Sequence, residues 1–211
     1  MMQMITGVRI FVLAAAFAAS GCASVLADIA KPNVRAEATA LRAGQYRLDS
    51  EHASLLFKVD HLGFSTYVGR FERFDASLDF DPERPQDAII EAIIDMTSLD
   101  IANDEFAATL MGPDWFSAEA FPQAAFRSTS IQITGETSGV MTGDLSLNGA
   151  NAPVSLNVEF NGGARDALRR AYVVGFSATG IIRRSHFSVD RFDGLVGDKV
   201  TLEIEAEFLR E

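Results

Sequence analysis

The chain has 211 residues, of which 48% are hydrophobic and 22% charged, and this composition is typical of one globular domain with a substantial core. Its formal net charge of −11 at pH 7 argues against nucleic acid and anionic lipid surfaces as partners, because both are negatively charged. Cys22 is the only cysteine, so the chain cannot form an intramolecular disulfide.

Residues 1–22 have the pattern of an export signal. Arg9 provides a positive charge, and an apolar run from Ile10 to Ala19 follows it. That run is too short to span a bilayer stably. We therefore expect a cleaved signal peptide rather than a permanent membrane helix.

The end of this signal, Ala19-Ser20-Gly21-Cys22, resembles a bacterial lipobox, with Ala19 in place of the usual leucine. The resemblance implies lipid attachment at Cys22. Because Ser24 rather than an aspartate lies beyond the cysteine, we expect a periplasmic protein anchored to the outer membrane, with the lipid anchor as its only membrane contact. The alternative is cleavage after Ala27, which would leave a soluble periplasmic protein.

Residues 23–44 are rich in alanine and carry mixed charge and Pro32. They lack the apolar spacing of a core element, and local helix is expected at most around residues 36–42. We interpret the segment as a tether that leads to a domain of residues 45–211.

Residues 48–80 alternate apolar and polar side chains in two runs that are joined near residues 63–66. Such alternation predicts strands with one buried face and one solvent-exposed face. Phe71 is out of phase with Phe74, which predicts a bulge near Glu72 and Arg73. The inward-facing side chains are expected to be Leu55, Phe57, Val59, Phe74, Ala76, Leu78 and Phe80.

Further strand patterns cover residues 88–96, 141–147, 154–160, 172–178 and 200–208. Turn-forming residues at 148–153 and 161–165 are expected to connect neighbouring strands. About eight strands with short connections favour an all-β fold, an antiparallel lipocalin-like barrel without exposed sheet edges. Residues 101–119 break the alternation with helical spacing around Gly112-Pro113, and we expect one or two short helices across a barrel opening.

Short motifs in one consistent order resemble the YceI family across roughly residues 45–209. The resemblance implies a periplasmic, lipocalin-like barrel that binds polyisoprenoids. The family's usual residues are replaced at Ile182, His186 and Ser188, and also at Asn103 before the expected helix, so the ligand itself is left open. The matching motifs include Leu48-Asp49, His61-Leu62-Gly63, Gly69-Arg70-Phe71, Phe80-Asp81-Pro82, Trp115-Phe116, Phe121-Pro122, Thr142-Gly143-Asp144-Leu145, Leu147-Asn148-Gly149, Arg183-Arg184-Ser185 and Val196-Gly197-Asp198.

Residue patterns for catalysis or metal binding are weak. His52, His61 and His186 lack the spacing of metal ligands, and no G-x-S-x-G motif is present. We therefore expect no metal, no cofactor and no enzymatic activity. The alternative is an envelope enzyme that acts on a hydrophobic substrate with His61 or His186 as its base.

Phenylalanine is abundant, with 16 residues. An eight-stranded barrel either fills with such side chains or keeps room for one ligand. We expect a non-enzymatic cell-envelope protein that encloses a long apolar molecule, such as a polyisoprenoid, an isoprenoid quinone or a fatty lipid. A filled barrel with a structural or stress-related role is the alternative, and a homodimer is left open. The side chains expected to contact the ligand are Phe57, Val59, His61, Phe71, Phe106, Leu110, Trp115, Phe116, Phe126, Phe176 and Arg184.

Two of these residues have alternative roles. His61 would either fix the turn at Gly63 through a strand-end hydrogen bond or contact a ligand headgroup. Arg184 would either pair with an internal carboxylate or meet a phosphate or quinone oxygen of the ligand.

Overall fold

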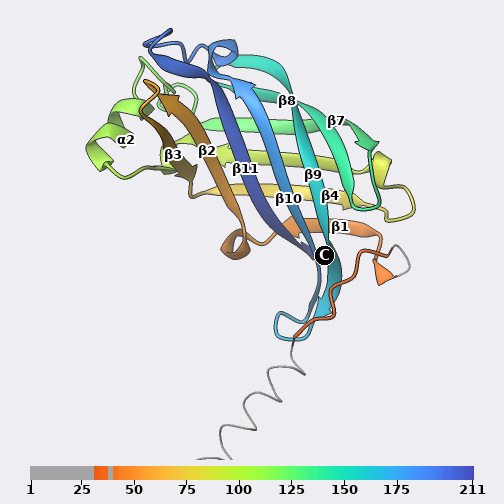
Figure 1. Cartoon of the computed structure of the whole chain (residues 1–211). Coiled ribbons are helices and arrows are strands. Elements are labelled where there is room, and N and C mark those ends of the chain that lie inside the picture. Colours follow the sequence, from red (N-terminus) through yellow and green to blue (C-terminus); the bar gives the residue numbers. More distant parts are fainter. Residues whose placement is uncertain (1–30, 38–39) are drawn as a thin grey trace, which may run out of the picture.

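A computed structural model describes residues 31–37 and 40–211. Within these residues the chain forms one α-helix, α2 (Asp104–Met111), and an antiparallel sheet of 11 strands (Figure 1). The strands are β1 (Gly44–Leu48), β2 (Ser54–His61), β3 (Ser65–Phe71), β4 (Phe74–Phe80), β5 (Ile89–Asp95), β6 (Leu99–Asp100), β7 (Gln123–Ile133), β8 (Ser138–Leu147), β9 (Ala150–Asp166), β10 (Ala171–Arg183) and β11 (Val196–Arg210).

Pairing between β1 and β11 closes the sheet into an eight-stranded barrel, as the sequence predicts. Around the ring the order is β1-β4-β5-β7-β8-β9-β10-β11. The wall is longer on one side, where three further strands lie end to end with strands of the ring. β2 lies beyond β1 and pairs with the N-terminal part of β11. β3 then pairs with β2 and lies beyond β4, and β6 pairs with β3 and lies beyond β5. The predicted irregularity at residues 72–73 is the break between β3 and β4, and it bends the wall.

The helix follows β6, which is only two residues long and pairs with β3 alone among the described strands. Asn103 begins the helix as its N-cap, since its Oδ1 accepts a hydrogen bond from the amide of Phe106 at 2.8 Å. Asp104 and Glu105 in the first turn suit the positive end of the helix dipole. Residues 101–119 therefore lie at the end of the barrel formed by β2, β3 and β6, where the sequence predicts a cover (Figure 1).

Inward-facing side chains follow the predicted alternation. In β11, Leu202, Ile204 and Phe208 line the interior, whereas Glu203, Glu205 and Glu207 alternate with them. The buried side chains form two clusters, one around Trp115 and Leu145 near the helix and one around Tyr46 and Val174 at the opposite end. The barrel wall is thus held by apolar contacts at both of its ends.

The turn expected at residues 161–165 is wrong, because β9 continues through this segment to Asp166. A bulge in the pairing with β10 omits Asn161, and Gly162 adopts a φ of +114°. A Cβ at Gly162 would lie 2.7 Å from Cγ1 of Val34, so glycine lets residues 31–37 approach the strand closely. The glycines that suggested a turn here instead make room for residues 31–37, which are distant in sequence.

Part of the expected tether contacts the barrel. Arg35 and Gly163 form an isolated antiparallel bridge, with N–O distances of 3.1 and 2.8 Å. Leu41 is 6% exposed in the second apolar cluster, and the hydroxyl of Tyr172 donates to the carbonyl of Ala40. None of the described helices is long and apolar enough to cross a bilayer. The signal, Cys22 and Ala27 lie outside the described residues.

Candidate functional site

The barrel interior holds a cavity of about 1150 Å³. Its wall comes from nearly every strand and from residues 106–116, and ionisable lining side chains of the Asp, Glu, His, Lys and Arg types occur only toward its ends. His61 and Arg184 lie near α2, whereas Arg35, Glu37 and Glu136 lie at the opposite end. Between them the lining is hydrocarbon and aromatic, which does not match the filled interior that was the alternative.

All eleven side chains expected to contact a ligand line this cavity. Their part in binding stays a prediction, but they lie on one continuous surface: strand alternation places six of them, and α2, the turn after it and the turn after β10 place the others. They are Phe57, Val59, His61, Phe71, Phe106, Leu110, Trp115, Phe116, Phe126, Phe176 and Arg184.

Aromatic rings close the cavity at the helix end. The ring of Phe116 meets that of Phe71 edge-on at 6.1 Å between centroids, and Phe106 meets Tyr67 in the same way at 6.1 Å. Trp115 is 9% exposed and lies 6.1 Å from Phe192. Residues 106–116 therefore form an aromatic flap. Its ring contacts are apolar and can be exchanged for contacts with an apolar ligand, and Asp114 adds an ion pair with Arg191 at 2.7 Å.

Asn148 fixes the far side of this flap and was not expected at the site. It occupies the two-residue turn between β8 and β9 with a φ of +50°, which asparagine tolerates better than most residues. Its Nδ2 donates to the carbonyls of Trp115 and Phe187, each at 3.1 Å, and lies 3.2 Å from the carbonyl of Ser188. The sequence signal, an Asn-Gly pair between alternating runs, predicts the turn but not this side-chain role.

Arg184 does not pair with a carboxylate, so the first of the two roles considered for it is wrong. The side chain is 6% exposed, and all of its hydrogen bonds go to main-chain carbonyls. These carbonyls belong to Val189 at 2.6 Å and to Arg191, Val196 and Gly197 at 3.0 Å. The guanidinium thus holds the segment that leads into β11, and its buried charge is solvated by peptide dipoles instead of an anion.

The turn after His61 is held by its neighbour. Asp60 Oδ1 accepts from the amide of Gly63 at 3.0 Å, and the amide of Phe64 donates to the His61 carbonyl at 3.0 Å. The expected hydrogen bond from the His61 side chain to this turn is therefore wrong. The imidazole instead lines the cavity, 6.2 Å from the ring of Tyr67.

Phenylalanines also pack at the end of the barrel opposite α2. The ring of Phe176 lies 5.1 Å from that of Phe160 and meets Phe80 and Phe208 edge-on at 6.3 and 6.1 Å. All four rings line the cavity. The interior therefore remains aromatic over its whole length, which suits a long hydrocarbon chain more than a compact polar metabolite.

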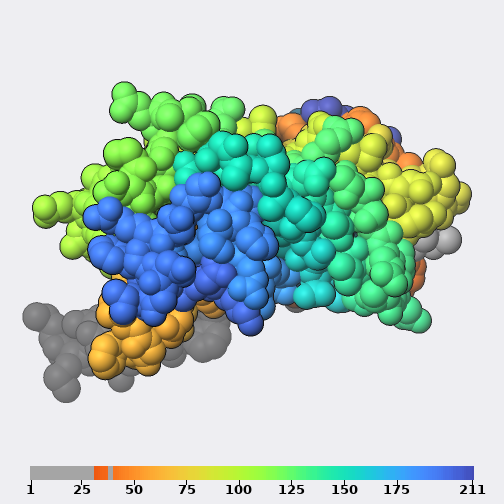
Figure 2. Space-filling view, turned by 90° about the horizontal axis from the view of Figure 1, so that it is seen from above, coloured from red at the N-terminus to blue at the C-terminus, as the bar shows by residue number. Residues whose placement is uncertain are grey.

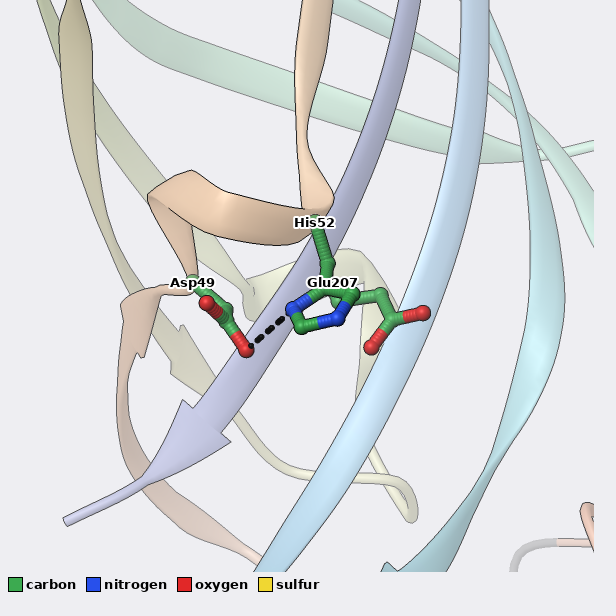
Figure 3. Close-up of side chains that lie close together, drawn as sticks. All are labelled: Asp49, His52 and Glu207. Atoms are coloured by element: carbon green, nitrogen blue, oxygen red, sulfur yellow. Dashed lines mark hydrogen bonds and ion pairs between the residues drawn. The ribbon is translucent and has the colours of Figure 1, made fainter. Parts of the chain in front are cut away.

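A cluster of Asp49, His52 and Glu207 lies apart from the cavity (Figure 3). Its ligand atoms lie within 4.8 Å of one another, a spacing that could suit a metal ion. However, Arg169 already donates to Asp49 at 2.8 Å and to Glu207 at 2.6 Å. Burial raises the pKa of Asp49, but hydrogen bonds from Arg169 and His52 outweigh it and hold that pKa below its ordinary value. We interpret the cluster as an ion-pair network that ties the β9–β10 turn to the barrel.

Comparison with known proteins places this geometry in a family. The YceI-like domain model matches residues 46–208. A UPF0312 protein of Photorhabdus laumondii is 36% identical over 176 residues, which cover 82% of this chain and 91% of that protein. The crystal structure of BcnA from Burkholderia cenocepacia matches with a TM-score of 0.69 and 24% identity, and covers 76% of this chain and 98% of BcnA.

A further solved structure is a domain of Saccharophagus degradans that is described as polyisoprenoid-binding. It matches with a TM-score of 0.57 and 13% identity, and covers 81% of this chain and 100% of that domain. At this identity the likeness concerns the fold. The match of the family model over most of the barrel confirms the resemblance seen in the motifs, and the chain belongs to the YceI family.

Proposed function

We propose that the protein is a non-enzymatic carrier of the cell envelope that encloses a long apolar molecule in its barrel, with polyisoprenoid chains as the leading class. The observation that carries this proposal is the cavity of about 1150 Å³, which reaches from the aromatic flap to residues 34–37. This volume lies just above the usual range for small-molecule pockets, about 300–1,000 Å³. The fold shared with the polyisoprenoid-binding domain of Saccharophagus degradans supports the same ligand class.

The binding energy would come from burial of hydrocarbon. Transfer of apolar surface from water contributes about 25 cal/mol per Å², so a chain that buries several hundred Å² needs few polar contacts. Polar groups at the ends of the cavity would orient a headgroup, and His61 is the lining side chain placed to do so near the flap. A polyisoprenoid, an isoprenoid quinone and a fatty lipid share this mode of binding.

The proposed location is the periplasm, with attachment to the outer membrane through Cys22. The support is the export signal and the lipobox-like Ala19-Ser20-Gly21-Cys22. Covalent incorporation of labelled fatty acid into the protein, and loss of that label in Cys22→Ser, would support the anchor. A mature N-terminus at residue 28 would instead establish cleavage after Ala27.

Mass spectrometry of solvent extracts tests the ligand. Protein purified from its native envelope should release one lipid per barrel, and the delipidated protein should take up added polyprenol with a change in the fluorescence of Trp115, the only tryptophan. Ala178→Phe places a ring in the cavity and should abolish uptake, whereas Thr179→Phe on the exposed face of the same strand should not. A lipid-free protein that also ignores added polyprenol would contradict the proposal.

A further inference from the structure

Five large apolar side chains are exposed at the flap end of the barrel. Phe64 is 88% exposed and Leu62 45% in the β2–β3 turn, and Phe106 on α2 is 40% exposed. Phe192 and Leu195, in the segment before β11, are 53% and 59% exposed. We call these five residues the apolar rim. Exposed apolar side chains that form a contiguous patch mark sites of protein or membrane interaction, whereas single ones do not.

The rim is one continuous feature although it comes from three segments. Val196 pairs with His61, so the turn of residues 62–64 lies beside residues 192–195. Figure 2 shows the two segments in contact, the turn in orange and the other segment in blue. The Tyr67 ring joins the third segment, because it lies 6.2 Å from His61 and 6.1 Å from Phe106.

The rim also continues into the cavity. Phe106 and Phe192 each have an exposed part and also line the interior, and so does His61 between them. A molecule that leaves the cavity at this end therefore passes over an apolar surface. Phe64, which does not line the cavity, extends that surface outward.

Ordered backbone holds the rim side chains away from the core. The β2–β3 turn is held by Asp60, and the amides of Leu195 and Val196 both donate to the carbonyl of Phe192 at 3.0 Å. Phe192 itself has a φ of +56°, a strained conformation for an aromatic residue. Strain at an exposed ring next to a cavity is consistent with a functional constraint on its position.

The charges beside the rim indicate the kind of surface that it fits. Asp60, Asp104, Glu105, Asp190 and Asp193 lie within two residues of a rim residue in sequence. Arg191 is the one cation at this spacing, and Asp114 pairs with it at 2.7 Å. An acidic border would be repelled by anionic headgroups but tolerates zwitterionic ones. Projecting side chains from separate turns suit a fluid apolar phase more than a complementary protein surface.

We propose that the apolar rim docks the mouth of the barrel on a zwitterionic bilayer, so that a lipid passes between membrane and cavity without crossing water. The proposal rests on the proposed carrier function and adds a membrane contact separate from an N-terminal anchor. The two contacts can be separated experimentally, because residues 31–37 lie at the opposite end of the barrel from α2 (Figure 1).

Vesicle flotation tests the docking step. The mature chain from residue 23 on, which carries neither the apolar run of the signal nor Cys22, should float with phosphatidylcholine vesicles and less with vesicles that contain phosphatidylglycerol. Phe64→Ser should reduce the vesicle partition coefficient about tenfold, which corresponds to loss of one apolar contact. Leu168→Ser is the matched control, since Leu168 is 80% exposed in the β9–β10 turn at the other end.

Transfer kinetics separate this proposal from the carrier function. With polyprenol in phosphatidylcholine vesicles, uptake by Phe64→Ser, followed by Trp115 fluorescence, should be slower, whereas its affinity for detergent-dispersed polyprenol should equal that of the parent protein. Vesicle binding that depends on Phe64, without uptake of polyprenol from vesicles or from detergent, would support the docking proposal and contradict the carrier function. Normal uptake with vesicle binding absent or indifferent to Phe64→Ser would overturn the docking proposal, as would a dimer that Phe64→Ser converts to monomer without effect on transfer.

Discussion

The side-chain amide of Asn148 donates to the main-chain carbonyl of Trp115 at 3.1 Å and so joins the β8–β9 turn to the aromatic flap. The same nitrogen donates to the carbonyl of Phe187 at 3.1 Å. One polar side chain thus links three segments that are distant in sequence. The other contacts of the flap include ring contacts and one exposed ion pair between Asp114 and Arg191, whereas Asn148 provides a partly buried polar link.

Substitution of Asn148 should loosen the flap. Asn148→Gly keeps a residue that tolerates the φ of +50° but removes both hydrogen bonds, and should lower the free energy of unfolding by about 1–3 kcal/mol. Asn148→Ala should cost more, because alanine adds backbone strain. Urea unfolding gives the free energies, and acrylamide quenching of Trp115 should increase in both variants. Unchanged quenching in Asn148→Gly would show that the other contacts suffice to hold the flap.

Replacement of Arg184 should destabilise the segment before β11. A lysine cannot reproduce the fork that reaches four carbonyls, so Arg184→Lys should lower the free energy of unfolding by about 2–4 kcal/mol and expose residues 189–197 to proteases. Arg183→Lys is the matched control, because Arg183 makes an exposed ion pair with Asp198 at 2.8 Å. Such a pair contributes at most about 1 kcal/mol. Equal effects of the two substitutions would contradict the role given to Arg184.

Acid should weaken the protein through Asp198. Hydrogen bonds from Ser185 and from Arg183 lower the pKa of Asp198 from 3.8 to about 2. Because the folded pKa is depressed, this stabilisation is complete above pH 4 and is lost as the pH falls toward 2. Because solvent screens this partly exposed carboxylate, Asp198→Asn should lose about 1 kcal/mol at pH 7, and its stability should depend less on pH between 4 and 2. Parallel pH profiles for the two proteins, from urea unfolding, would exclude this contribution.

Alternation predicts the wall of the barrel well, because each strand has one face in the apolar interior. Phe57, Phe126 and Phe176 were expected to line the cavity from their spacing and the family resemblance, and they do so. The same rule cannot predict β9 beyond Asn161, because Gly162 and Gly163 have no side chain to alternate. Gly162 and Gly163 pair with Gly175 and Val174 of β10, and the lack of a Cβ at Gly162 makes room for Arg35, a contact that local sequence does not encode.

Positioning residues are harder to predict from sequence. Arg184 and Asn148 were visible as family motifs, but their partners are backbone carbonyls, which every residue carries. Only the tertiary fold decides which carbonyls meet the guanidinium or the amide. Leu41 is a similar case, since a single leucine in an alanine-rich stretch gives no period, yet the fold buries it.

Glycine at position 69 makes room for Phe57 across the β2–β3 pair. A Cβ there would lie 2.4 Å from Cζ of Phe57 and 2.7 Å from Cγ2 of Ile101, so Gly69→Ala must push the ring into the cavity. We expect a loss of about 1–3 kcal/mol in the free energy of unfolding and weaker binding of added polyprenol.

A second substitution tests whether the displaced ring of Phe57 is the cause of the lost stability in Gly69→Ala. If it is, Phe57→Leu should cost less in the Gly69→Ala background than in the parent protein, a coupling that a double-mutant cycle measures. Gly175→Ala is the control, because its Cβ would meet only Cβ of Asn161 at 3.7 Å, and it should change stability by less than about 0.5 kcal/mol. Additive effects of the Gly69 and Phe57 substitutions would mean that the clash is relieved through Ile101, and polyprenol affinity would then be unaffected by position 69.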